Sequence, residues 1–137
     1  MADNRCETAA DNLPRFSFGD SSEMANSLLA LVVNGTKTAT CSALGEFEGR
    51  EITRVGEQYI IGDGAQRTAC RIEITSVETI PFDKVRASFA YLEGEGDRSL
   101  QHWRAVHETY FRRLDIFVPD MPLVCEIFEI LEQNERC

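Results

Sequence analysis

Apolar residues recur at helical spacing in two parts of the chain. The first part lies between Asp20, which would cap a helix, and Gly35, which would end it. Its apolar positions are Met24, Leu28, Leu31 and Val32. The second part covers residues 98–114, and its apolar face consists of Leu100, Trp103, His107, Tyr110, Phe111 and Leu114. This spacing predicts two helices, each packed by one face against the rest of the protein.

Most of the remaining regular segments have the composition of β-strands. Residues 36–42 are small or β-branched and predict one strand. Residues 58–80 predict a hairpin with a short glycine-containing turn and a long second arm. One face of that arm is apolar and consists of Cys70, Ile72 and Ile74. Residues 123–131 predict a final strand that closes the sheet.

An acidic, glycine-rich segment separates the strands from the second helix. Residues 93–97, Glu-Gly-Glu-Gly-Asp, fit neither a helix nor a strand, so we expect a loop there. Ahead of this loop, Asp83 would cap a short helix that extends through Tyr91.

The order of these elements predicts an α+β fold. We expect a small, curved antiparallel β-barrel with helices packed against it, a form that binds ligands at its mouth. The length of 137 residues suits one domain, which we place at residues 16–131. Residues 1–15 are expected to form a flexible N-terminus, and residues 132–137 a C-terminal tail.

Charge and cysteine content narrow the class of protein. The formal net charge of −9 argues against duplex DNA as a partner. No apolar run approaches the roughly 20 residues of a membrane span, and the start of the chain lacks the pattern of an export signal. We therefore expect a cytoplasmic protein without a membrane partner. The five cysteines include no C-x-x-C pair, and Cys41, Cys70 and Cys125 are expected to be reduced core residues.

The basic residues are unevenly distributed. Only two of the 14 basic residues are lysines, Lys37 and Lys84. One segment with a single acid, Glu108, contains the arginines Arg98, Arg104, Arg112 and Arg113. Because a guanidinium stacks on bases and pairs with phosphate, this segment would suit a nucleotide or short single-stranded RNA.

Residues 35–42, Gly-Thr-Lys-Thr-Ala-Thr-Cys-Ser, place several hydroxyl groups around one lysine. A lysine in a cleft can lose its proton and activate a threonine hydroxyl, here that of Thr40. In a regular strand Lys37 and Thr40 would lie on opposite faces, so they converge only if Lys37 precedes the strand. The alternative is an ordinary exposed strand with one lysine.

The acidic loop is the second candidate for chemistry. Its glycines would let Glu93, Glu95 and Asp97 face one point, where they could bind a divalent cation or act as a general acid or base. The alternative is a solvated loop in which Asp97 or Ser99 caps the next helix.

The two histidines do not form a metal-binding pair. His102 and His107 are five residues apart, about 140° around a helix, whereas a metal pair needs a spacing of four. His107 lies in the apolar stripe and is expected to be a hydrogen-bonded core residue.

These motifs, in this order, resemble the ASCH domain, a PUA-like β-barrel family associated with RNA. Residues 35–42 resemble the family's G-x-K-T-x-T signature, and residues 55–57 resemble the V-G-D segment that leads into the barrel. Residues 93–107 resemble the E-G-E-G-D-x-S-L-x-x-W-x-x-x-H stretch of larger bacterial members. The resemblance extends from about Phe16 to Leu131 and implies a cleft between barrel and helices, with Lys37 and the acidic loop on its wall.

The resemblance implies two kinds of activity. Some members of the family are described as small ribonucleases. A shorter class is described as amidohydrolases of N4-acylated cytidine, which use the lysine and the second threonine of K-T-x-T together with a glutamate. By position these residues are Lys37, Thr40 and Glu95, with Glu93 as the other candidate glutamate.

We therefore predict a protein that binds RNA, a ribonucleotide or a nucleoside in the cleft and hydrolyses single-stranded RNA. The predicted catalytic residues are Lys37, Thr40 and Glu95. The predicted substrate-binding residues are Thr38, Ser42, Arg98 and Arg104. No cofactor is required in this prediction, but Mn²⁺ or Mg²⁺ could bind at the acidic loop, through Glu93, Glu95 and Asp97.

Two alternatives stay open at this point. One is an amidohydrolase of N4-acylated cytidine nucleosides, and the other is an RNA-binding module without turnover. The two enzymatic mechanisms require opposite states of one group, because Lys37 must be neutral to activate Thr40 and charged to stabilise a phosphate.

Overall fold

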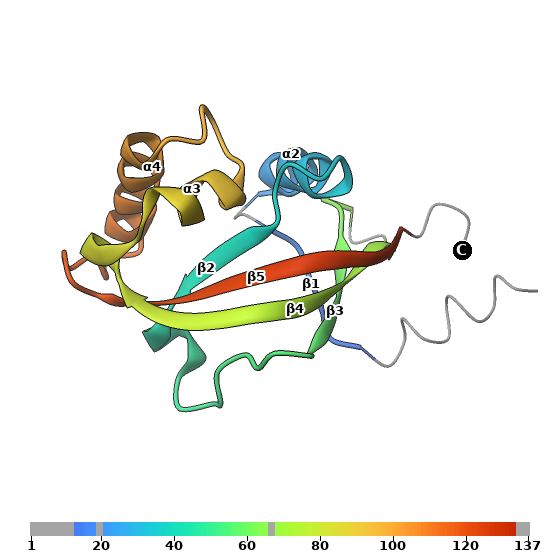
Figure 1. Ribbon diagram of the computed structural model, residues 1–137, viewed down its shortest axis with the longest axis horizontal. Coiled ribbons are helices and arrows are strands. Elements are labelled where there is room, and N and C mark those ends of the chain that lie inside the picture. Colours follow the sequence, from blue (N-terminus) through green and yellow to red (C-terminus); the bar gives the residue numbers. More distant parts are fainter. Residues whose placement is uncertain (1–12, 19–20, 66–67, 134–137) are drawn as a thin grey trace, which may run out of the picture.

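Five strands form one sheet in the computed structural model of the chain, which describes residues 13–18, 21–65 and 68–133. The strand order is β1-β3-β4-β5-β2. The strands are β1 (Arg15–Phe16), β2 (Ala39–Ala43), β3 (Gln58–Gly62), β4 (Thr68–Pro81) and β5 (Pro122–Gln133). Neighbouring strands are antiparallel except for β1, which runs parallel to β3. The sheet is curled into a half-barrel, and β1 and β2 stand at the two ends of the strand order (Figure 1).

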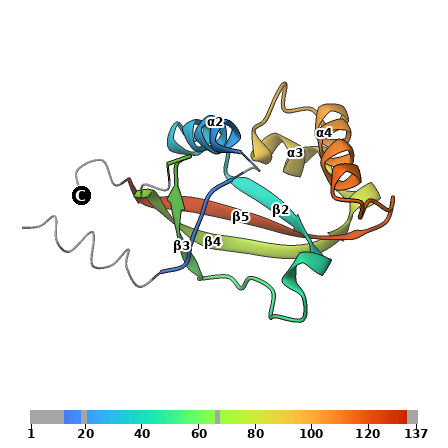
Figure 2. The same cartoon turned by 180° about the vertical axis from the view of Figure 1, so that it is seen from behind.

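Within the described residues, three α-helices accompany the sheet. They are α2 (Ser22–Val33), α3 (Ala87–Glu93) and α4 (Leu100–Arg113), and the short 3-10 helices η1 (Leu44–Phe47) and η2 (Phe82–Lys84) follow β2 and β4. Helix α2 packs against β3 and β5, whereas α3 contacts β2 and α4. Figures 1 and 2 show α2 over one end of the sheet and α3 with α4 over the other.

This architecture confirms the predicted α+β fold, with the barrel present as an open, curled sheet. The predicted hairpin is formed by β3 and β4, in which Ile61 lies opposite Cys70. The side chains of Cys70, Ile72 and Ile74 are at most 1% exposed, so the predicted apolar face of the second arm is confirmed. The final strand is longer than expected, because β5 extends to Gln133.

Two helix caps differ from the predictions. Helix α2 is capped by Ser21, whose hydroxyl accepts a hydrogen bond from the N–H of Met24 at 3.1 Å. The expected cap, Asp20, lies outside the described residues. Asp83 was wrongly predicted as a cap, because it lies in η2 and α3 begins after Arg86 without a side-chain cap.

The acidic segment 93–97 is not entirely a loop. Glu93 is the last residue of α3, and Gly94 ends the helix in the left-handed conformation, with a φ of 77°. Ser99 caps α4 through the N–H of His102 at 3.0 Å, and Asp97 accepts from the N–H of Ser99 at 2.9 Å. The prediction of a loop was therefore wrong for Glu93, which the helix carries into the interior.

The buried residues form two hydrophobic clusters. One lies beneath α3 and α4 and includes Phe82, Phe89, Trp103 and Phe111. The other lies beneath α2 and includes Phe18, Val32, Ile61, Ile72 and Phe128. Cys70 and Cys125 are buried free thiols in strands, as expected of core cysteines, whereas the free thiol Cys41 is only partly buried. Among the described residues, no helix is long and apolar enough to cross a bilayer.

Candidate functional site

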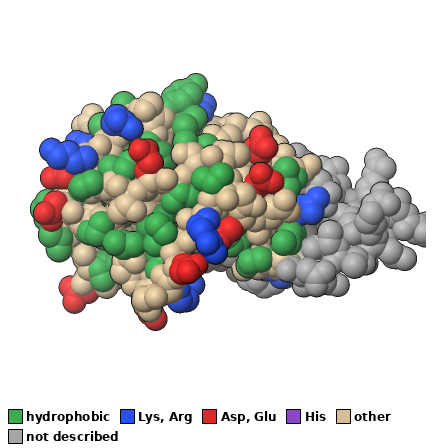
Figure 3. All heavy atoms as spheres, turned by 60° about the horizontal axis from the view of Figure 1, so that its bottom comes forward, with side chains coloured by type: hydrophobic (Ala, Val, Ile, Leu, Met, Phe, Trp, Pro, Cys, Tyr) green, Lys and Arg blue, Asp and Glu red, His purple; other side chains and the backbone are tan. Residues whose placement is uncertain are grey.

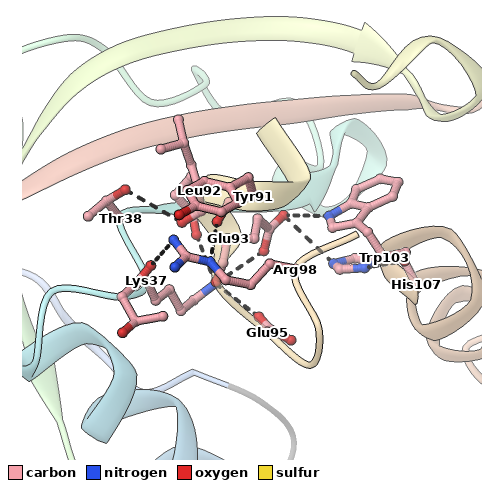
Figure 4. Close-up of polar contacts among 11 residues, drawn as sticks. Lys37, Thr38, Tyr91, Leu92, Glu93, Glu95, Arg98, Trp103 and His107 are labelled. Carbon is pink, nitrogen blue, oxygen red and sulfur yellow. Dashed lines mark hydrogen bonds and ion pairs between the residues drawn. The ribbon is translucent and has the colours of Figure 1, made fainter. Parts of the chain in front are cut away.

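A lysine with almost no solvent exposure is the centre of the site. The side chain of Lys37 is 1% exposed, and its Nζ lies 3.1 Å from Oε1 of Glu93 and 3.0 Å from Oε2 of Glu95 (Figure 4). The ammonium also donates to the carbonyl of Ala39 at 2.8 Å. These acceptors account for the three protons of the ammonium. Lys37 therefore offers a ligand its positive charge rather than a free N–H.

The local chain path explains how Lys37 reaches this position. Strand β2 begins at Ala39, so Lys37 precedes the strand, which was the condition for Lys37 and Thr40 to converge. The N–H groups of Thr36 and Lys37 both donate to the carbonyl of Leu31 at the end of α2, at 2.9 and 3.0 Å. Lys37 and Thr40 consequently line one cavity.

Gly94 positions the two glutamates that face Lys37. A Cβ atom at Gly94 would lie 2.5 Å from the carbonyl oxygen of Thr36, because the end of α3 lies directly against the segment before β2. The φ of Gly94 is also positive, at 77°. Glycine is therefore required here both for its conformation and for the close approach of two backbone segments.

Gly94→Ala is expected to lower the free energy of unfolding by about 3 kcal/mol or more, since a left-handed backbone and a backbone clash both add to the cost. Gly35→Ala is the matched control, because Gly35 also has a positive φ but a Cβ there would meet nothing within 4 Å. We expect about 1 to 2 kcal/mol for the control, measured by urea unfolding. Equal losses in both variants would contradict the close approach at Gly94.

Glu93 connects Lys37 to helix α4. Its Oε2 accepts a hydrogen bond from the indole Nε1 of Trp103 at 3.0 Å and lies 3.8 Å from Nε2 of His107. Nδ1 of His107 lies 2.9 Å from the carbonyl of Trp103. Because a carbonyl only accepts, Nδ1 carries a hydrogen, and Nε2 is the ring nitrogen that faces Glu93. His107 is thus hydrogen-bonded within the core, as expected, but it also lines the cavity of Lys37.

The buried pair is charged. Burial disfavours the ammonium of Lys37, but the ion pairs with Glu93 and Glu95 outweigh burial and raise its pKa above the ordinary value of 10.5. Burial likewise opposes ionisation of Glu93, yet Lys37, His107 and the Trp103 hydrogen bond lower its pKa below 4.5. At neutral pH Lys37 is therefore an ammonium, the state that the ribonuclease mechanism requires and the amidohydrolase mechanism excludes.

Two cavities share part of their walls beside this pair. The smaller, of about 160 Å³, is lined by Lys37, Glu93, Glu95 and His107, and also by Arg113. The larger, of about 410 Å³, extends along β2 toward η1. The residues that line both are Phe18, Thr40, Cys41 and Tyr110. Phe18 follows β1 and Thr40 lies in β2, so the cavities open between the two edges of the half-barrel.

The predicted substrate-binding residues differ in whether they line a cavity. Ser42 lines the larger cavity, whereas the hydroxyl of Thr38 is directed toward the carbonyl of Leu92 at 3.5 Å. Arg98 and Arg104 line neither cavity. Arg98 stacks on Tyr91 at 3.7 Å and donates to main-chain carbonyls, as Arg104 also does.

The cavities have other arginines on their walls. Arg113 lines the smaller cavity and Arg50 the larger. On the face drawn in Figure 3, acidic and basic side chains are scattered among apolar and uncharged groups. No extended basic field covers that face.

The carboxylates of the acidic segment do not meet at one point. Glu93 and Glu95 both face the ammonium of Lys37, whereas Asp97 is exposed and accepts from the N–H of Ser99. Lys37 thus occupies the place that the sequence suggested for a divalent cation.

Cys41 is a site residue that the sequence did not reveal. Its Sγ, a carboxylate oxygen of Glu93 and a ring nitrogen of His107 all lie within 4.8 Å of one another. Burial and the nearby Glu93 raise the pKa of the Cys41 thiol well above its ordinary value, so the thiol is protonated and a poor nucleophile. The only signal was its place in the strand beside Thr40, which is equally typical of a core cysteine.

Comparisons with known proteins agree on the class of fold. A protein from Enterococcus faecalis with a known crystal structure is 38% identical in sequence to this chain. The two structures superpose with a TM-score of 0.79, over 89% of this chain and 78% of that chain. The ASCH domain from Lactobacillus crispatus is 31% identical, with a TM-score of 0.80 over 92% of this chain and 84% of that chain. A hypothetical protein that is 14% identical shares the fold alone, with a TM-score of 0.55 over 77% and 92% of the two chains. No curated protein matches.

These findings define an α+β protein whose curled sheet and three helices have the ASCH-like arrangement. The model of the ASCH domain matches residues 14–132, nearly the whole described part of the chain. The chain belongs to the ASCH domain family, as the resemblance of its motifs predicted.

Proposed function

We propose that this protein binds short single-stranded RNA or a ribonucleotide in the cleft and hydrolyses it. The observation that carries the proposal is the position of Glu95, which a buried lysine holds at the wall of a cavity shared with Thr40. The side chain of Glu95 is 25% exposed, and its second oxygen, Oε1, has no hydrogen-bond partner among the described residues. Glu95 can therefore contact a ligand and Lys37 at once.

Glu95 is suited to act as the general base in RNA cleavage. Its carboxylate would take the proton of a ribose 2′-hydroxyl, and the 2′-oxygen would attack the adjacent phosphorus. The bond from phosphorus to the 5′-oxygen then breaks, and the leaving oxygen takes a proton from water. The products are a 2′,3′-cyclic phosphate and a 5′-hydroxyl, and addition of water opens the cyclic phosphate.

The neighbouring residues would provide charge and orientation. Lys37 holds Glu95 in place and puts a positive charge beside the reacting phosphate, where it counters the charge that develops. Arg113, on the same wall, is a second cation for the phosphate, and the Thr40 hydroxyl is placed to bond the ribose or phosphate. No metal is needed, because Lys37 supplies the cation between the two glutamates.

An amidohydrolase of N4-acylated cytidine is the second candidate. It is favoured by the small cavity in which Lys37, Thr40 and Glu95 meet. Its mechanism requires Lys37 to accept the proton of Thr40, however, and the ion pairs raise the pKa of Lys37. We therefore rank the amidohydrolase activity below RNA cleavage as a candidate function.

The test is to incubate the purified full chain with labelled single-stranded RNA, with DNA of the same sequence and with N4-acetylcytidine, each with and without EDTA. We expect cleavage of the RNA only, because DNA lacks the 2′-hydroxyl, and no effect of EDTA. Deacetylation with intact RNA would establish the amidohydrolase instead. RNA that is bound but intact would indicate a binding module without turnover, and loss of cleavage in EDTA would show that a metal is required.

A further inference from the structure

A buried glutamate on the wall of the larger cavity has no part in the Lys37 site. Glu126 lies in β5, is 8% exposed and stands directly opposite Thr40 of β2. Thr53, also 8% exposed, lines the same cavity, and its hydroxyl lies near enough to the carboxyl group of Glu126 to favour the charged form. Glu126 therefore faces the cavity from the sheet, beside the threonine of the proposed catalytic site.

The carboxyl group of Glu126 has no ion-pair partner within the part of the chain that the structure describes. Among the described lysines, arginines and histidines, none forms an ion pair with Glu126. Arg50 also lines the cavity, but its guanidinium donates to the carbonyls of Phe47 and Glu46. Burial raises the pKa of Glu126, as is usual for a carboxyl group in this environment.

The hydrogen-bonding capacity of Glu126 is largely unused. A carboxyl group has about four acceptor positions, and among the described residues the Thr53 hydroxyl is the neighbour that favours its charged form. Burying such a group without donors is costly, so retaining it at a cavity wall points to a ligand that brings N–H groups.

Aromatic rings form part of the remaining lining of the cavity. Four rings line it, those of Phe18, Phe47, Tyr59 and Tyr110. Aromatic faces stack on flat ligands without regard to their detailed chemistry, and the volume of about 410 Å³ accommodates a nucleoside. Aromatic rings beside the buried carboxyl group of Glu126 describe a site for a planar ring that has an N–H edge. The other carboxyl group on the wall, that of Glu46, is exposed.

We infer that the larger cavity recognises a nucleobase that carries an exocyclic amino group, with Glu126 accepting the amino N–H. Cytosine, adenine and guanine have such a group, whereas uracil presents two carbonyl oxygens around a single N–H. A base on Glu126 would bring its ribose to Thr40, which lines both cavities. The inference rests on the proposed function for the nature of the ligand, but its test measures binding and requires no turnover.

The test is isothermal titration of the full chain with CMP, AMP, GMP and UMP. We expect at least one amino-bearing nucleotide to bind about tenfold more tightly than UMP, the discrimination of one good base contact. In Glu126→Gln the side-chain amide keeps an oxygen that can accept from an amino group, but it also offers an N–H group to a uracil carbonyl. That variant should therefore narrow the preference, because its affinity for UMP rises relative to the others.

Glu129→Gln is the matched control, because Glu129 lies on the same strand but is exposed. We expect it to keep the preference of the unmodified chain. Equal affinity for all four nucleotides, or a preference that Glu126→Gln leaves unchanged, would overturn base recognition by Glu126. Base-selective binding without RNA cleavage would uphold this inference and overturn the proposed hydrolysis, and RNA cleavage without base selectivity would do the reverse.

Discussion

Lys37→Met is expected to lower the free energy of unfolding by about 3 to 5 kcal/mol, the usual cost of removing one partner from a buried ion pair. The loss comes from Glu93, which is 2% exposed and would keep its charge in the interior without the ammonium at 3.1 Å. Methionine fills most of the volume of the lysine stem, so an empty cavity contributes little. Urea unfolding followed by circular dichroism measures the change.

The double variant Lys37→Met/Glu93→Gln separates charge from packing. If an unpaired buried carboxylate is the cause, removing its charge should recover part of the stability lost in the single variant. Lys84→Met is the control for loss of a lysine, because Lys84 is exposed and is the only other lysine in the sequence. A Lys37→Met protein as stable as the Lys84→Met protein would contradict the buried pair.

Helices and strands could be predicted where burial imposes a repeat on the sequence. Strand β4 alternates because one of its faces packs on the core, and α4 has an apolar stripe for the same reason. The helix ends were harder to predict from the sequence, because the capping residue depends on the backbone path before the helix. Ser21 and Asp20 are both good caps by composition, and only the fold determines which one takes that role.

The pairing of Lys37 with Glu93 and Glu95 connects residues more than 50 positions apart. The spacing around Lys37 showed only that a turn must precede the strand, and the family resemblance implied that Lys37 and the acidic segment lie on the wall of one cleft. Neither indicated that the ammonium would lie between two carboxylates, since this depends on the close approach of Gly94 to Thr36. Tertiary packing creates this geometry, and no local pattern encodes it.

Arg98 and Arg104 show why charge pattern alone did not identify the ligand-facing cations. Both guanidiniums donate to main-chain carbonyls near the ends of helices, a structural role that arginine fills as readily as phosphate binding. The sequence did contain a clue to Glu126, because this residue is an acid at an inward-facing position of an apolar strand. Such an acid is informative because burial without a partner is costly.

Glu95→Gln is expected to reduce the rate of RNA cleavage by about 10² to 10⁴-fold, the usual contribution of a general base. The amide keeps the shape of the side chain and an oxygen that can accept from Lys37, but it cannot take the proton of a 2′-hydroxyl. Affinity for RNA should change little, because the substrate is held by the rest of the cleft. Single-turnover cleavage and equilibrium binding of the same labelled RNA measure the two effects separately.

Glu108→Gln is the matched control for this prediction. Glu108 lies on α4, outside both cavities, and its carboxylate pairs with Arg112 at 2.7 Å. Removing its charge should leave cleavage within about twofold of the unmodified chain, since exposed pairs contribute little to stability. If Glu95→Gln cleaves RNA as fast as Glu108→Gln does, Glu95 is not the base. If both binding and cleavage are lost together, Glu95 holds the substrate instead of activating it, and the base must be sought elsewhere on the cavity wall.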